Sequence, residues 1–241
     1  MPCDQFAVND DGLLVWVGPG GSLKNPQWGA NGPTFGFHGQ NRTLAWGSPF
    51  IGWGLDPRTG DTTNLLKVGK TTPNFHVGLS SSLSWHNFSL YGLMEWVHGF
   101  SVYNVPQQWA VFRGYAGIMD QTGKPQNEQK PIGYYNRLYG VASLTPVNYF
   151  VQDASFAKLR EVSLSYRLTR SQLAKAGFLR SFQGISLSLI GRNLLTFTKY
   201  NGYDPEVGNA GGETGSAAIA RVDGYEYPNF RTFTAAITVN Y

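Results

Sequence analysis

The sequence predicts an all-β protein whose strands form an antiparallel, up-and-down sheet, an incomplete part of a transmembrane β-barrel wall with long outer loops. Three observations favour this fold class. The C-terminal residues alternate between apolar and small or polar side chains, short and long connections alternate between the predicted strands, and no apolar run is long enough for a membrane-spanning helix. Composition points the same way, because aromatic residues make up 15% of the 241 residues and charged residues only 14%.

The last predicted strand carries the clearest alternation. Side chains along a strand alternate between its two faces, so one face carries Phe233, Ala235, Ile237, Val239 and Tyr241, and the other Thr232, Thr234, Ala236, Thr238 and Asn240. Taken alone, this segment would also suit an ordinary strand of a soluble sandwich. Because it ends on an aromatic residue, it resembles the terminal strand of bacterial outer-membrane barrels. That resemblance implies that Phe233 and Tyr241 act as an assembly signal.

Four earlier segments show the same period of two. Residues 75–85 and 88–97 are joined by the short turn His86-Asn87, which predicts an antiparallel hairpin. Residues 161–168 and 185–197 predict two further strands, and residues 169–178 a connector with one helical turn from Ser171. Residues 13–17 and 50–55 are weaker strand candidates in a region rich in Gly, Pro, Asn and Trp.

The connections between the five main strands predict their topology. Two are short, at 86–87 and 169–180, and two are long, at 99–153 and 199–229. In an up-and-down sheet both long loops then leave from one end and both short ones from the other, as in outer-membrane barrels. We therefore divide the chain into a loop-rich upstream barrel segment, residues 1–72, and a C-terminal part of the barrel, residues 73–241.

Charge and cysteine content exclude several classes of protein. The net charge of +4 comes from scattered basic residues without a basic block, so no nucleic-acid partner is expected. The single cysteine, Cys3, cannot form an internal disulfide, and neither a basic nor an apolar leader stands before it. We expect the start at Met1 to be a truncation of a longer protein.

No pattern of residues predicts catalysis, a cofactor or a firm metal site. The four histidines lack metal-ligand spacing, and no nucleophile motif or spaced carboxylate pair is present. Asp204 and Glu206 could hold Ca²⁺, but packing of their loop is the simpler interpretation. Aromatic residues of the long loop could stack on sugar rings or cover a partner, or simply pack against the loop itself; they are Trp109, Tyr115, Tyr134, Tyr135 and Tyr139.

Three segments, in order along the chain, resemble one family. They are Asp153-Ala-Ser-Phe-Ala-Lys-Leu-Arg-Glu-Val-Ser-Leu-Ser-Tyr166, Gly191-Arg-Asn-Leu-Leu-Thr-Phe-Thr-Lys-Tyr-Asn-Gly-Tyr-Asp-Pro-Glu-Val207 and the stretch from Tyr227 to Tyr241. Together they resemble the C-terminal end of SusC/RagA-type TonB-dependent outer-membrane transporters. The family-motif positions are Asp153, Lys158, Arg160, Glu161, Arg192, Asn193, Asp204, Pro205 and Arg231.

The resemblance implies a barrel of about 22 strands with a plugged lumen, embedded in outer-membrane lipid of a Gram-negative bacterium. It also implies import of glycans or peptides with a SusD-like lipoprotein partner, and contact with TonB through an N-terminal region that this sequence lacks. It implies no enzymatic activity and no cofactor. The main alternative is a soluble carbohydrate-binding β-sandwich module. A secreted β-rich hydrolase is a weaker third interpretation.

Overall fold

The computed structural model describes residues 3–37, 40–49, 54–55, 58–60, 62–63, 67–126, 128–138, 147–179, 181–208 and 221–241. By compactness the chain divides into two units. Unit 1 comprises Met1–Gly69, Tyr103–Gln152 and Val222–Tyr225, and unit 2 comprises Lys70–Val102, Asp153–Arg221 and Glu226–Tyr241. The division expected between residues 72 and 73 stays a prediction.

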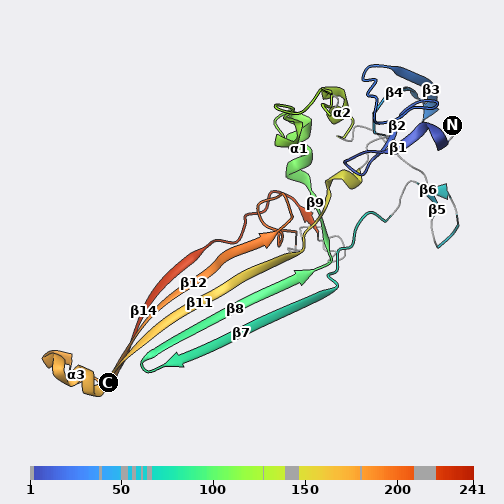
Figure 1. The fold of residues 1–241 in the computed structure, drawn as a ribbon. Helices are drawn as coiled ribbons and strands as arrows, with labels where there is room; N and C mark the ends of the chain where they lie inside the picture. Colours follow the sequence, from blue (N-terminus) through green and yellow to red (C-terminus); the bar gives the residue numbers. More distant parts are fainter. Residues whose placement is uncertain are drawn as a thin grey trace. The chain divides into compact units, whose positions relative to one another are not determined.

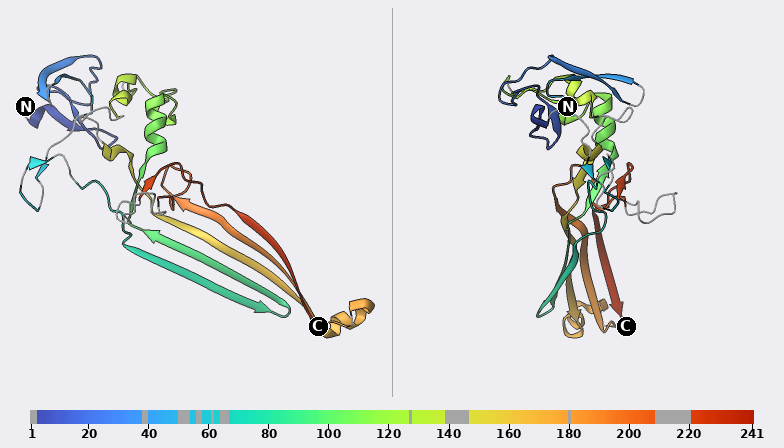
Figure 2. Two further views of the ribbon diagram at one scale, coloured as in Figure 1. Left: turned by 180° about the vertical axis from the view of Figure 1, so that it is seen from behind. Right: turned by 90° about the vertical axis from the view of Figure 1, so that its right-hand side faces the viewer.

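Unit 2 contains the predicted antiparallel sheet of five strands (Figure 1). The strands are β7 (Phe75–Trp85), β8 (Phe88–His98), β11 (Phe156–Thr169), β12 (Gly184–Thr198) and β14 (Thr232–Asn240), and their order is β14-β12-β11-β8-β7. Every pair of neighbours in this main sheet is consecutive along the chain among its five strands, so the expected nearest-neighbour pairing is confirmed. Figure 2 shows the same five strands from two further directions.

Short connections lie at one end of this sheet. His86 takes a left-handed φ of 53° in the two-residue turn between β7 and β8, as such tight hairpins require. Between β11 and β12, α3 (Arg170–Leu173) is followed by the 3₁₀ turn η4 (Ala174–Leu179). A capping box at Thr169 begins α3, with the Thr169 amide donating to Gln172 Oε1 at 2.9 Å. The expected helical turn is therefore confirmed, one residue earlier than predicted.

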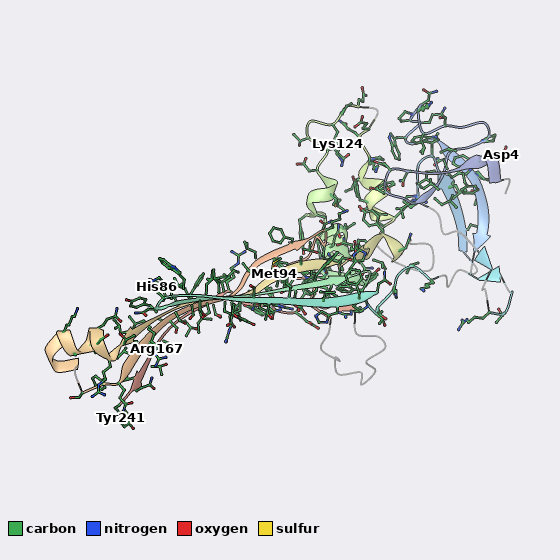
Figure 3. All side chains as sticks on the ribbon, turned by 60° about the horizontal axis from the view of Figure 1, so that its bottom comes forward. Asp4, His86, Met94, Lys124, Arg167 and Tyr241 are labelled. Carbon is green, nitrogen blue, oxygen red and sulfur yellow. The ribbon has the colours of Figure 1, made fainter. Side chains whose placement is uncertain are left out.

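The two faces of the sheet differ sharply in chemistry. Register places Val162, Leu164, Leu187, Ile237 and Val239 on one face, together with most of the apolar residues of β7 and β8. Large side chains on this face stand open, with Leu79 68%, Leu189 64% and Ile237 70% exposed. The opposite face carries the serines and threonines, and the hydroxyls of Ser165 and Ser188 are 2.8 Å apart across β11 and β12. Figure 3 shows side chains projecting from both faces along the whole length of the strands.

Near the other end, part of the polar face is covered by its own loop. Val97 and Phe156 point to this face and are buried with Phe100, Tyr200 and Val207 in a small apolar cluster. The segment from Tyr200 to Val207 therefore folds over the sheet instead of extending into solvent. This packing explains why β8 alternates less strictly than β7, because Val97 is an apolar residue on the polar face.

Unit 1 is formed by short elements around a second core. Its N-terminal part holds η1 (Cys3–Gln5), β1 (Phe6–Val8), β2 (Leu14–Trp16), β3 (Asn31–Phe37), β4 (Gln40–Ala45), β5 (Gly54–Leu55) and β6 (Thr62–Thr63). Leu14–Trp16 confirms one weak strand candidate; of the other, only Gly54–Leu55 lies within the described residues, as a strand. The core includes Val15, Trp16, Trp46, Val111 and Tyr134.

The long connection predicted over residues 99–153 contains several short helices and strands in its described part. These are β9 (Ser101–Asn104), α1 (Val105–Arg113), η2 (Gly117–Met119), α2 (Ile132–Asn136), η3 (Val147–Phe150) and β10 (Val151–Asp153), and β13 (Val222–Asp223) pairs in parallel with β9. Asn104 caps α1 by accepting from the Gln107 amide at 2.9 Å, and Gly114 ends it with φ 76°. No helix in the described part of the chain is long and apolar enough to span a bilayer.

Candidate functional site

A β-bulge gathers charged residues on the polar face of the sheet. The pairing of β11 with both neighbours shifts between Leu159 and Glu161, so Arg160 is an extra residue at this point. Over the same span β12 is one residue longer, from Arg192 to Leu195, and Asn193 takes a left-handed φ of 52°. A bulge redirects side chains locally. Here it brings Lys158 and Glu161 to the same face, although their spacing of three would separate them in a regular strand.

Lys158 is the centre of this ionic cluster. Its side chain is only 1% exposed, and its ammonium group lies 2.6 Å from Asp204 Oδ1 and 2.5 Å from Glu206 Oε2. A buried charge is tolerated only when it is paired and hydrogen-bonded. Lys158 on the sheet and the two carboxylates on the loop therefore depend on each other.

The Asp204-Pro205-Glu206 segment is shaped to present both carboxylates. Asp204 Oδ1 accepts from the Glu206 amide and Oδ2 from the Asn229 amide, both at 3.0 Å. Asn229 also donates its side-chain amide to Glu206 Oε2 at 2.8 Å, and Pro205 is buried. These bonds fix two separate parts of the long loop, residues 204–206 and Asn229, to the same point.

Arg160 extends the cluster across the sheet. It donates to both oxygens of Glu206, one at 2.8 Å, and pairs with Glu95 of β8, which in turn contacts His76 of β7. Burial alone would raise the pKa of Glu206, but hydrogen bonds and charges from Arg160 and Lys158 outweigh it and hold that pKa at about 2. Glu206 is therefore ionised at neutral pH.

An open hollow of about 370 Å³ lies beside Arg160 on the same sheet. It is lined by His76, Glu95, Arg160, Glu161 and Arg192, with Gly78, Leu93 and Met94. Arg192 donates to Glu161 at 2.8 Å, and the Arg192 side chain is 59% exposed. Charged side chains of both signs thus border the hollow, and most of them pair with one another.

The structure brings together most of the predicted family-motif residues. Lys158, Arg160, Asp204 and Pro205 lie in the cluster, and Asn193 joins it through Arg160 at 3.5 Å while donating to the Phe230 carbonyl at 3.1 Å. Asp153 instead accepts from the Ser155 amide at 2.9 Å and fixes the entry to β11. Arg231 is exposed outside the cluster.

Sequence reasoning missed Glu95, His76 and Asn229. Glu95 is the one acidic residue of β8, which was the available signal. Its position opposite Lys158 follows from a register that the bulge interrupts. The structure favours the packing interpretation of Asp204 and Glu206 over a calcium site, because both carboxylates are paired with Lys158 or Arg160. Among the described residues no group of three potential metal ligands is found.

The candidate aromatic residues of the long loop divide into two sets. Tyr134 and Tyr135 are buried in the core of unit 1, as internal packing predicts. Trp109 and Tyr115 are exposed, at 37% and 70%, and Tyr139 lies outside the described residues. Phe233 and Tyr241 of the expected assembly signal are 81% and 93% exposed, and Tyr241 follows the last residue of β14.

Curated proteins of Formosa agariphila are similar to this chain. "TonB-dependent receptor P3" is 28% identical over 178 residues, which cover 72% of this chain, and "TonB-dependent receptor P26" is 26% identical over 75% of it. "TonB-dependent receptor P39" is 33% identical over 92 residues. The chain spans only 17% and 18% of the length of the first two relatives. No protein-family profile matches the chain.

Solved structures of the RagAB peptide importer share the fold. A RagAB chain in the "open-open" state matches 95% of this chain with a TM-score of 0.51 and 18% identity. The chain is therefore similar to TonB-dependent receptors over about three quarters of its length, 72% and 75% in the first two relatives. The resemblance to the SusC/RagA type is confirmed, since the receptor relatives and the RagAB fold agree. The predicted fold class, an all-β antiparallel sheet that forms an incomplete part of a barrel wall, is confirmed as well.

Proposed function

We propose that the five-stranded sheet of unit 2 is a C-terminal wall segment of an outer-membrane importer for glycans or peptides. In this role the apolar face of the sheet lies against lipid and the polar face lines a wet lumen. The importer would draw energy through TonB and work with a SusD-like surface lipoprotein. The sheet would form part of the wall of the transport path and would take no part in catalysis.

The open apolar face carries this proposal. Side chains such as Leu79, Leu189 and Ile237 are mostly exposed although they are large and apolar, and soluble monomers rarely expose an apolar patch of more than a few hundred Å². Strand length supports the same role. An 11-residue strand such as β7 extends over about 36 Å, and a tilt of ~45° reduces this to the ~25 Å height of a barrel's apolar band.

The open apolar face argues against the alternative, a soluble β-sandwich. A sandwich buries one face of each sheet against a second sheet about 10 Å away. Among the described residues, the five strands form a separate sheet whose apolar face stays open. A sandwich would instead leave the polar face open and cover the leucines.

Membrane fractionation and heat-modifiable migration test the proposed function. We expect the native protein to sediment with the outer membrane, to require detergent for extraction, and to migrate differently in gels before and after boiling. A product that stays monodisperse without detergent and shows one migration position would refute the barrel role and favour the sandwich.

A further inference from the structure

The end of the main sheet that carries the short connections has cationic side chains but no acidic ones. The acidic residues that the structure describes in unit 2 lie at the bulge or on the side of the long loops; they are Glu95, Asp153, Glu161, Asp204, Glu206 and Glu226. No Asp or Glu occurs within 73–94, 162–203 or 227–241, which include both short connections and the strand residues next to them. The exposed cations at this end, Arg167, Arg170 and Lys175, are therefore not balanced by acidic side chains of the sheet.

The connector that carries Arg170 and Lys175 is fixed to the sheet. Gln172 Oε1 of α3 accepts from the Thr169 amide and from Asn87 Nδ2, both at 2.9 Å, so the connector is joined to the turn between β7 and β8. Leu173 of α3 is only 1% exposed. Figure 1 shows α3 beyond the ends of the strands and beside the C-terminus. The two cations therefore belong to a held element rather than to a free loop.

Exposed aromatic rings mark the same end on the apolar face. Trp85 and Phe88 flank the turn at 86–87, pair in register, and are 67% and 42% exposed. In membrane proteins such rings gather at the level of the lipid headgroups. In the proposed barrel wall they place the boundary between hydrocarbon and headgroups at this end of the sheet, and the Asn87–Gln172 bond places α3 next to it.

We propose that Arg170 and Lys175 bind the headgroup phosphate of an anionic phospholipid, with Arg167 adding to the positive field. Guanidinium and ammonium groups both pair with phosphate. A headgroup with a net negative charge is favoured over a zwitterionic one, which carries its own cation. Short connections of outer-membrane barrels face the periplasm, so the lipid belongs to the periplasmic leaflet. The inference rests on the proposed function, because only a sheet embedded in a bilayer brings α3 to a headgroup.

Fluorescence quenching in bilayers of phosphatidylcholine tests the proposal on the native protein. A fluorophore is attached through Ser171→Cys, after Cys3→Ser, because Ser171 is exposed and lies on α3. The bilayer contains a small, fixed fraction of either phosphatidylglycerol or phosphatidylcholine with a nitroxide near the headgroup, which quenches only at short range.

We expect the phosphatidylglycerol probe to quench more strongly than the phosphatidylcholine probe. One Lys or Arg near the surface enriches an anionic lipid about fivefold, so the local enrichment should be at least about fivefold. The preference should fall at 1 M salt, where the Debye length is about 3 Å. Equal quenching by the two probes, or quenching by neither, would overturn the proposal.

Two double variants locate the site. Arg170→Gln with Lys175→Gln should remove most of the preference for phosphatidylglycerol. Lys199→Gln with Arg231→Gln is the matched control, because it removes two exposed cations at the other end of the same sheet, and it should leave the preference unchanged. If both double variants lower the preference equally, it reflects net charge and the site is refuted.

The lipid site and the barrel role fail in different measurements. Failed outer-membrane fractionation, with one migration position in gels, would overturn the barrel role. A native protein that fractionates with the outer membrane and shows heat-modifiable migration, but no preference for phosphatidylglycerol at position 171, would overturn only the lipid site.

Discussion

Replacing Lys158 by methionine should release the loop that folds over the polar face of the sheet. Methionine has a similar length but no charge, so Asp204, whose side chain is 7% exposed, would lose its cation. Removing one partner of a buried ion pair typically costs about 3–5 kcal/mol because the other charge is left uncompensated. Here Glu206 keeps Arg160, and Asp204 keeps two backbone donors. We therefore expect about 2–4 kcal/mol.

Amide hydrogen exchange in the native protein measures this effect at defined atoms. The amides of Glu206 and Asn229 both donate to Asp204, so their protection reports directly on the closed loop. A loss of 2–4 kcal/mol corresponds to a fall in protection of roughly 30- to 900-fold. Protection in the middle of β11 should not change.

Arg192→Gln is the matched control. It breaks the pair with Glu161 on the same face, but the Arg192 side chain is 59% exposed, and exposed pairs contribute about 0–1 kcal/mol. If Lys158→Met lowers protection at Glu206 and Asn229 no more than Arg192→Gln does, the cluster does not hold the loop.

Three further predictions concern the loop, the bulge and the C-terminus. The folded-state pKa of Glu206 is about 2 against an ordinary 4.5, so the stabilisation of the loop by ionised Glu206 is complete above about pH 4.5 and is lost as the pH falls towards 2. The rate of proteolysis within residues 199–208 should therefore rise only between these two pH values. A rate that does not change with pH would contradict this. Asn193→Ala should cost about 1–3 kcal/mol because φ is 52° there, whereas Asn193→Gly should cost less; equal thermal stability of the two variants would argue against backbone strain. Tyr241→Asp should lower barrel abundance in cells but not refolding into detergent, since a charge near the interface costs only about 0–1 kcal/mol; equal losses in both assays would refute an assembly signal.

Much of unit 2 could be predicted from alternation alone. Strands β7, β8, β12 and β14 keep their period of two over most of their length. The short connection at 86–87 and the long one at 99–153 predicted which end of the sheet carries the short connections. The cluster was harder to predict because the extra residue Arg160 reverses the alternation. Glu161 continues the polar face of the strand after the bulge, and Lys158 occupies that face only because of the bulge.

Unit 1 could not be predicted from local pattern. The core of residues 1–69 and 103–152 consists of aromatic and aliphatic side chains from short elements far apart in sequence, such as Trp46, Val111 and Tyr134. Such elements carry too few residues for a periodic signal. The helix Val105–Arg113 did carry readable signals, since Asn104 before it and Gly114 after it are typical caps.

In the proposed barrel wall, the apolar face of the sheet contacts lipid and the polar face contacts water. Nitroxide labels at positions 164 and 165 test it most directly, because these neighbours on β11 lie on opposite faces and the only native cysteine, Cys3, can be replaced by serine. In the native protein in bilayers, the label replacing Leu164 should be accessible to oxygen, and the one replacing Ser165 to a water-soluble nickel complex. The reverse pattern, or equal accessibility of both labels to the nickel complex, would contradict a barrel wall.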